Sequence, residues 1–212
     1  GEIIGTAFPL NEMVETQFNI YNKYKVKGDK GLMFRTEIIK EYPFPVYEGE
    51  KFITEAIVYN RISEKYKMLY INEKIEIKEY QENGLTSGYN SLLLRNPKGQ
   101  ALYHNERNRH YMSFKDKLLN NAVYYKFCKA AGYKISKIWK DSEAKIFLLM
   151  ALPVGIYMTL KIKSETASRA KRTSSTSLSL SSTTLYSESP ISVRFISMAE
   201  CRFFADSICS RR

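Results

Sequence analysis

The pattern of hydrophobic and polar positions over the first hundred residues changes between helical and strand-like spacing. Residues 12–21 predict a helix, with Asn11 placed to cap it. The apolar run 53–62 predicts a second helix that begins after Thr54. Residues 68–71 and the strictly alternating stretch 75–80 predict short strands, with turns at 43–45, 48–49 and 83–84. This mixture of elements predicts an α/β fold.

The pattern after residue 113 is helical and increasingly apolar. Residues 114–139 carry Lys, Tyr, Phe and Leu at helical spacing and predict one or two amphipathic helices broken at Gly132. The apolar run 146–160 is shorter than the ~20 residues of a membrane-spanning helix, and it contains Pro153 and Gly155. A core helix or an interfacial segment is therefore favoured over a span. Together with the lysines before it, this run is also suited to the cytoplasmic face of a membrane.

The composition changes sharply near Lys163. Ser and Thr dominate residues 164–212, where Lys171 is the single lysine. The run 173–184 has no helical period and few apolar side chains, so it predicts disorder. The change in composition also indicates a second interpretation, a foreign or out-of-frame extension. A phosphorylated linker or a basic interaction tail is the remaining alternative.

The charge of the chain is strongly positive but not concentrated. The formal net charge is +11, and 44% of the residues are hydrophobic, as in globular proteins. The lysines are interleaved with acids, for example over 74–79, which is typical of a solvated face and not of a nucleic-acid site. Anionic lipid headgroups or a phosphorylated acceptor remain alternative partners for such a surface. The three cysteines have neither metal-ligand spacing nor a plausible disulfide framework, which favours a reducing, cytoplasmic setting. With only two histidines, a zinc site is not expected.

The densest group of chemically active residues lies in the segment 42–56. Two prolines and Gly49 fix a loop, and Glu48, Glu50 and Glu55 follow one another around it. A carboxylate in the first turn of a helix is stabilised in its charged form. Glu55 is therefore a candidate general base for a hydroxyl, as glycosyl transfer by direct displacement requires. The alternative is an ordinary residue at the start of a helix.

Several spaced blocks give this chain a resemblance to a known family. They are residues 28–31, 34–37, 42–45, 49–52, 55–56, 59–62, 66–68, 79–80, 84–86, 95–99 and 152–155. In this order they resemble the second half of bacterial family 2 glycosyltransferases, over residues 1–163. The resemblance implies a partial GT-A (Rossmann-like) fold. It divides the chain into the acceptor-side part of a catalytic domain (1–112), basic amphipathic helices with an apolar C-terminal segment (113–163) and a tail (164–212).

The resemblance also implies a reaction. The intact enzyme would transfer a sugar from a UDP-type nucleotide sugar to a saccharide or lipid-linked acceptor, in cell-surface polysaccharide synthesis at the inner face of the membrane. A divalent metal, Mg²⁺ or Mn²⁺, would lie on an Asp-x-Asp motif. This chain has no Asp-x-Asp and begins at Gly1 without an initiator Met, which predicts a piece of a longer protein. We therefore expect the chain alone to bind neither the donor nor the metal.

The family's acidic pair, which supplies the catalytic base, matches Glu55 and Ala56, so the second acid is replaced. Glu55 is the first candidate for the base, and Glu50 is the second, as a residue that orients the acceptor. The candidates for substrate binding are Asp29, Lys30, Arg95 and Lys98. The alternatives for these four are a turn-stabilising aspartate and exposed, solvated bases.

Two other classes of function remain open for the whole chain. One is a non-catalytic basic module that binds a membrane or a nucleic acid, although no nucleic-acid motif is present. The other is a truncated fragment without activity of its own.

Overall fold

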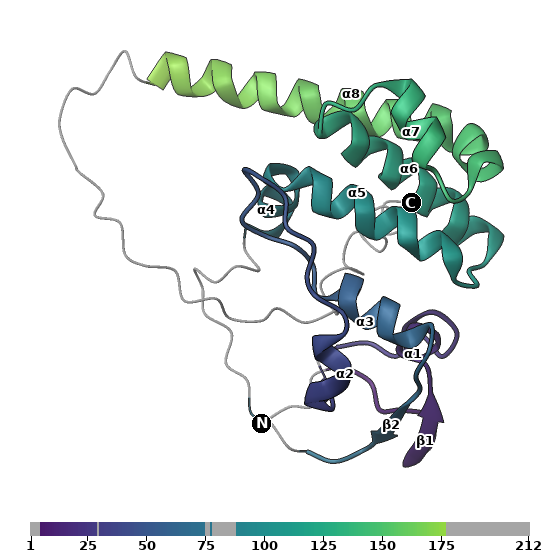
Figure 1. The fold of residues 1–212 in the computed structure, drawn as a ribbon. Helices are drawn as coiled ribbons and strands as arrows, with labels where there is room; N and C mark the ends of the chain where they lie inside the picture. Colours follow the sequence, from purple (N-terminus) through teal and green to yellow (C-terminus); the bar gives the residue numbers. More distant parts are fainter. Residues whose placement is uncertain (1–4, 29, 75–76, 78–87, 177–212) are drawn as a thin grey trace.

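The computed structural model describes residues 5–28, 30–74, 77 and 88–176, with side chains as far as residue 164 (Figure 1). Most of this part of the chain is helical. The elements are, in order, β1 (Glu12–Glu15), α1 (Gln17–Asn22), α2 (Thr36–Lys40), α3 (Ala56–Ser63), β2 (Met68–Ile71), α4 (Tyr89–Arg95), α5 (Pro97–Glu106), the short 3₁₀ helix η2 (Arg107–Arg109), α6 (Phe114–Ala130), α7 (Ile135–Asp141) and α8 (Lys145–Thr176).

The two strands form an antiparallel pair in which Met13 faces Tyr70 across the ladder. Met13 packs against the cluster that includes Ile20 and Tyr70, whereas its neighbour Val14 is 63% exposed. This alternation has the period of a strand. The predicted helix over 12–21 is therefore wrong. Its first residues form β1, and α1 begins after Thr16, whose hydroxyl accepts the amide N–H of Asn19 over 3.3 Å.

Three local predictions are confirmed. The strand over 68–71 is β2, and the helix expected after Thr54 is α3. The break expected at Gly132 separates α6 from α7, and Gly132 has a φ of 76°, which favours glycine. The predicted strand 75–80 and the turn at 83–84 lie outside the described residues, apart from Ile77.

Helix α8 is longer than the sequence predicts. It has 32 residues and runs through Pro153. Gly155 allows a close approach to α6, because a Cβ at this position would lie 2.9 Å from Cδ1 of Tyr125 and 3.2 Å from the carbonyl oxygen of Ala122. The backbone is helical as far as Thr176, past the composition change at Lys163, and the rest of the predicted tail lies outside the described residues.

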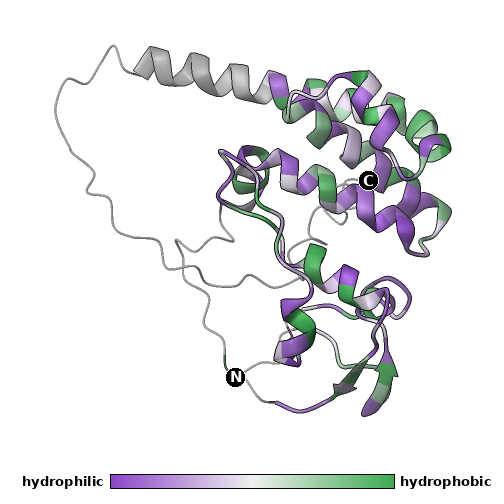
Figure 2. Cartoon of the chain, in the orientation of Figure 1, coloured by the Kyte–Doolittle hydropathy of each residue, from purple (hydrophilic) through white to green (hydrophobic). Residues whose placement is uncertain are grey.

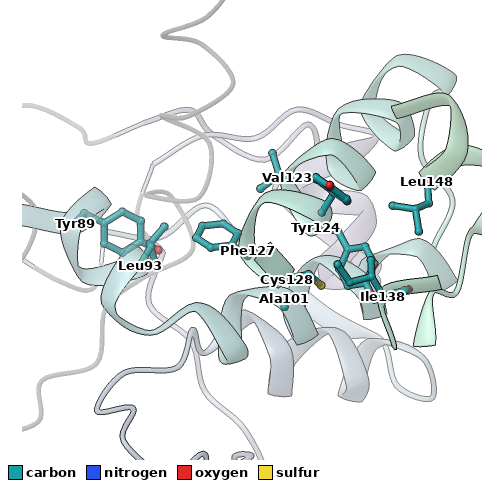
Figure 3. Close-up of a cluster of buried hydrophobic side chains, with 10 residues drawn as sticks. Tyr89, Leu93, Ala101, Val123, Tyr124, Phe127, Cys128, Ile138 and Leu148 are labelled. Atoms are coloured by element: carbon teal, nitrogen blue, oxygen red, sulfur yellow. The ribbon is translucent and has the colours of Figure 1, made fainter. Parts of the chain in front are cut away.

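The largest hydrophobic core lies among α4, α5, α6, α7 and α8 (Figure 3). Phe127 and Cys128 of α6 are almost fully buried in it, together with Ile138 of α7 and Leu148 of α8. Smaller clusters lie around the two strands and on both sides of α3. Helix α3 thus packs between the N-terminal elements and α5.

The predicted partial GT-A fold stays a prediction. The part of the chain that the structure describes contains helices and a single two-stranded antiparallel sheet. The division at residues 112 and 163 also stays a prediction.

Candidate functional site

Glu55 lies at the N-terminal end of α3, as the sequence predicts. The hydroxyl of Tyr59, one turn further along the helix, donates a hydrogen bond to Oε2 of Glu55 over 2.8 Å. The ring of Tyr59 stacks on Phe34, with 4.9 Å between the ring centroids. Burial and the carboxylate of Glu55 raise the pKa of Tyr59, so its hydroxyl keeps its proton and remains a donor. The carboxylate of Glu55 is therefore held by its own helix. Its Oε1 is buried, while the residue as a whole is partly exposed.

The position after Glu55 is closed to solvent. Ala56 is 0% exposed and packs with Ile57 and Tyr103 in the cluster between α3 and α5. A carboxylate at this position would be desolvated, which disfavours its charged form. Of the two positions that match the family's acidic pair, Glu55 is thus the one that carries a carboxylate, and as a residue it is partly exposed.

Glu50 is engaged in a different way, because its two oxygens accept amide hydrogens from the first turn of α5. Oε1 accepts the N–H of Lys98 over 2.6 Å, and Oε2 accepts the N–H of Gly99 over 2.9 Å. The first amides of a helix have no partner within the helix, and a negative charge beside them is stabilised. Asn96 binds the same loop, with Oδ1 accepting the amides of Lys51 and Phe52 over 2.7 and 3.1 Å. Glu50 therefore joins the loop to α5.

The candidates for substrate binding are only partly brought together. Lys98 lies beside the loop, where its Nζ donates to the carbonyl oxygen of Glu48 over 3.2 Å. Arg95 is exposed in the last turn of α4. The Nζ of Lys30 donates to the carbonyl oxygen of Lys27 over 3.0 Å, and Asp29 lies outside the described residues. Lys98 is thus the candidate that the structure places in contact with the Glu50 loop.

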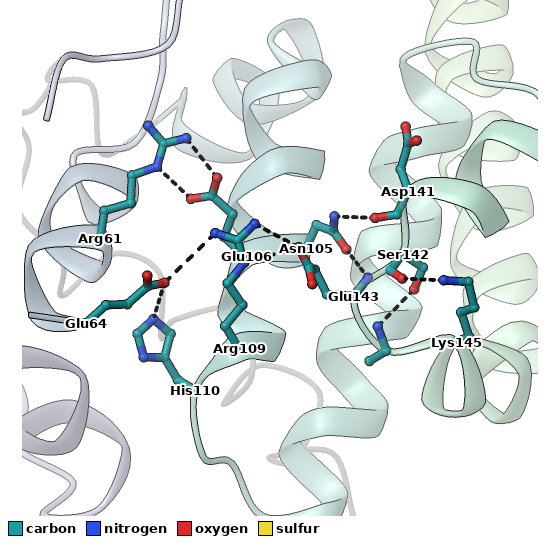
Figure 4. Close-up of polar contacts among 11 residues, drawn as sticks. Arg61, Glu64, Asn105, Glu106, Arg109, His110, Asp141, Ser142, Glu143 and Lys145 are labelled. Carbon is teal, nitrogen blue, oxygen red and sulfur yellow. Dashed lines mark hydrogen bonds and ion pairs between the residues drawn. The ribbon is translucent and has the colours of Figure 1, made fainter.

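A polar network between α3, α5 and the start of α8 is not predicted by the sequence (Figure 4). The guanidinium of Arg61 donates to both oxygens of Glu106, over 2.9 and 2.8 Å, and the Glu106 side chain is only 8% exposed. Arg109 binds Glu143 over 2.7 Å, at a more exposed position. Because Arg61 and Glu106 are 45 residues apart, no local pattern indicates their pairing.

His104 is held inside the helical part of the chain. Its Nδ1 lies 2.8 Å from Oδ1 of Asn120, and its ring stacks on Phe127 with 5.7 Å between centroids. Burial, with a smaller effect of Arg107, lowers the pKa of His104 to about 3. The ring is therefore neutral at pH 7, and its Nδ1–H donates to Asn120, which is a structural role.

The described residues do not fit a divalent metal. They contain no group of three or more His, Cys, Asp or Glu side chains placed to hold an ion. The metal that the resemblance implies stays a prediction for the intact enzyme.

No protein-family model matches this chain, and neither a curated protein nor a solved structure matches it. The resemblance to family 2 glycosyltransferases therefore rests on the spaced sequence blocks.

Proposed function

We propose that residues 1–163 are the C-terminal portion of a family 2 type glycosyltransferase, with its acceptor-side part over residues 1–112, and that Glu55 is its general base. The observation that carries the proposal is the hydrogen bond of 2.8 Å by which Tyr59 fixes the carboxylate of Glu55 at the start of α3. A base has to be held in a defined orientation and to reach the proton that it removes.

The reaction needs one proton transfer from this part of the enzyme. As the acceptor hydroxyl attacks the anomeric carbon, its proton passes to Glu55. The new carbon–oxygen bond forms while the bond to the nucleotide diphosphate breaks. The donor, a UDP-type nucleotide sugar, and the Mg²⁺ or Mn²⁺ ion that neutralises the leaving diphosphate belong to the donor-binding half of the intact enzyme.

The remaining candidates have supporting roles in this proposal. Glu50 sets the loop that precedes the base, because both of its oxygens are used by α5. Lys98, with Arg95, Lys30 and Asp29, would bind the saccharide or lipid-linked acceptor through its phosphate or hydroxyl groups. The enzyme would act in the cytoplasm, in synthesis of a cell-surface polysaccharide.

The test is to fuse the chain in frame behind the donor-binding half of a family 2 glycosyltransferase and to measure release of UDP. We expect saccharide acceptors to stimulate the release above that of the donor half alone. A fusion that is folded by circular dichroism and binds UDP, but shows no acceptor-dependent release, would contradict the proposal. That result would favour an inactive fragment. Salt-sensitive binding to oligonucleotides or vesicles without transfer would favour a non-catalytic module.

A further inference from the structure

Helix α8 exposes a continuous apolar face. Over residues 146–160 the exposed side chains recur every three or four positions, so they share about 160° of the helix surface. Figure 2 shows the hydrophobic character of this part of α8. The face includes Ile146 (75% exposed), Leu149 (58%), Met150 (48%), Val154 (41%), Tyr157 (64%) and Leu160 (60%).

The opposite face of α8 is already used. Leu148 and Ala151 are buried, and Gly155 lies against Tyr125 and the backbone of α6. Helix α8 is thus packed in the fold and still exposes apolar side chains. One side packs on the core, and the other is uncovered within the described residues.

The charges around the uncovered face indicate which kind of partner it binds. Residues 144–164 contain no Asp or Glu, and exposed lysines stand at both ends, Lys145 at the start and Lys161 and Lys163 after the last apolar turn. An apolar face bordered by lysines at its ends suits lipid tails and anionic headgroups together. A protein partner that covered this face would have to supply acidic side chains for these lysines.

We propose that α8 docks this face on the surface of a membrane that contains anionic lipid, with the helix lying in the plane of the interface. By length and composition, residues Lys145–Ser164 also pass as a candidate span, with 20 residues and a mean hydropathy of 1.6. The packing of α6 along α8 argues against that orientation, because α6 would bring Lys115, Lys117 and Lys129 with it into the hydrocarbon. The proposal does not depend on the proposed catalytic function.

The test is co-sedimentation of the full chain with vesicles of phosphatidylcholine, with and without a third of phosphatidylserine. We expect binding that is stronger on the anionic vesicles and weaker at high salt. The double variant Leu149→Glu/Tyr157→Glu should lower the bound fraction at least about tenfold. Both side chains are exposed, so the substitutions remove contacts with lipid and leave the core of the protein unchanged. Val46→Glu is the matched control, since Val46 is 91% exposed outside α8, and it should bind as the wild type does.

The charge at the end of α8 is tested separately. Lys161→Glu/Lys163→Glu should weaken binding to anionic vesicles several-fold, whereas Lys40→Glu/Lys51→Glu, at exposed positions elsewhere, should have a smaller effect.

Four outcomes would overturn the proposal. The first is the absence of vesicle binding, and the second is equal binding by the Leu149→Glu/Tyr157→Glu and Val46→Glu variants. Retention in the membrane after alkaline carbonate extraction would show a span instead. A concentration-dependent dimer that is lost in the double variant, without vesicle binding, would assign the face to a second copy of the chain.

Discussion

The carboxylate of Glu50 lies over the first turn of α5 and accepts the amide N–H of Gly99 over 2.9 Å. Its other oxygen accepts the neighbouring amide of Lys98 over 2.6 Å. These two bonds give Glu50 the position of a helix cap supplied from a distant loop. The two acids that the sequence offers as catalytic candidates therefore have different partners. Glu50 binds backbone amides of α5, whereas Glu55 is held by a tyrosine hydroxyl at the start of α3.

Replacing Glu50 by alanine should destabilise the fold. The variant leaves two amides of α5 without their acceptor, and loss of a helix cap costs about 1–2 kcal/mol. The free energy of unfolding from chemical denaturation measures the loss. Glu48→Ala is the control, because the side chain of Glu48 is exposed in the same loop, and it should change stability by less than about 0.5 kcal/mol. Equal effects of the two variants would remove the capping role.

Gly99→Ala should also destabilise, although alanine is the better helix former. The added Cβ would lie 2.7 Å from Cγ1 of Ile53 and 3.2 Å from its Cδ1, so the loop would have to move away from α5. Overpacking of this kind costs about 1–3 kcal/mol, which exceeds the gain in helix propensity. Gly88→Ala meets no atom within 4 Å and should be close to neutral. A stabilised Gly99→Ala variant would show that the loop and α5 are not in close contact.

The ion pair between α3 and α5 should contribute more than the exposed one beside it. Arg61→Met leaves Glu106 nearly buried without its partner, and we expect a loss of about 2–3 kcal/mol. Arg109→Met removes a pair in which both side chains are more than a third exposed, so the loss should be under about 1 kcal/mol. Thermal or denaturant unfolding of the two variants checks the order. An equal loss would mean that the Arg61–Glu106 pair is solvated in solution.

His104 should make the fold less stable in mild acid. Its pKa falls from the ordinary value of 6.5 to about 3 in the fold, because burial disfavours the charged ring. Between these values the unfolded chain binds a proton that the folded chain does not. The contribution of the neutral ring is therefore complete above pH 6.5 and declines as the pH falls. At pH 5 the loss from this residue is about 2 kcal/mol.

The measurement is the unfolding free energy of the wild type and of His104→Gln between pH 7 and pH 5. The variant loses packing at both pH values, so the slope is the informative quantity. The fall in unfolding free energy between pH 7 and pH 5 should be about 2 kcal/mol smaller in His104→Gln than in the wild type. Parallel slopes would show that His104 is accessible to protons in the folded state.

The sequence predicted those elements whose signals are local. Helix α3 follows the loop that ends at Thr54, and Gly132 ends α6 at a positive φ that glycine tolerates best. Strand β1 was mistaken for part of a helix because it is defined by its pairing with β2, more than fifty residues later. The apolar run 146–160 predicted a shorter helix than α8, in which packing of the residues on both sides of Pro153 against α6 keeps the helix continuous.

The geometry of the candidate site was predictable to a similar extent. The position of Glu55 at the start of a helix was predicted because the preceding loop and the helix are both visible over a few residues. The capping role of Glu50 was not predicted, since its partners lie 48 and 49 residues away. The pairing of Arg61 with Glu106 was missed for the same reason. Contacts of this range depend on how α3 and α5 pack, and a single sequence carries no signal for them.

The central claim is that Glu55 acts as the general base, and the rate of sugar transfer by Glu55→Gln in the fused enzyme tests it most directly. Glutamine preserves the shape of the side chain and an acceptor for the Tyr59 hydroxyl but cannot take up the proton. We predict a fall in the turnover rate of about a hundredfold or more, with UDP binding and thermal stability close to those of the wild type. Transfer by Glu55→Gln at a rate within a few-fold of the wild type would contradict the account.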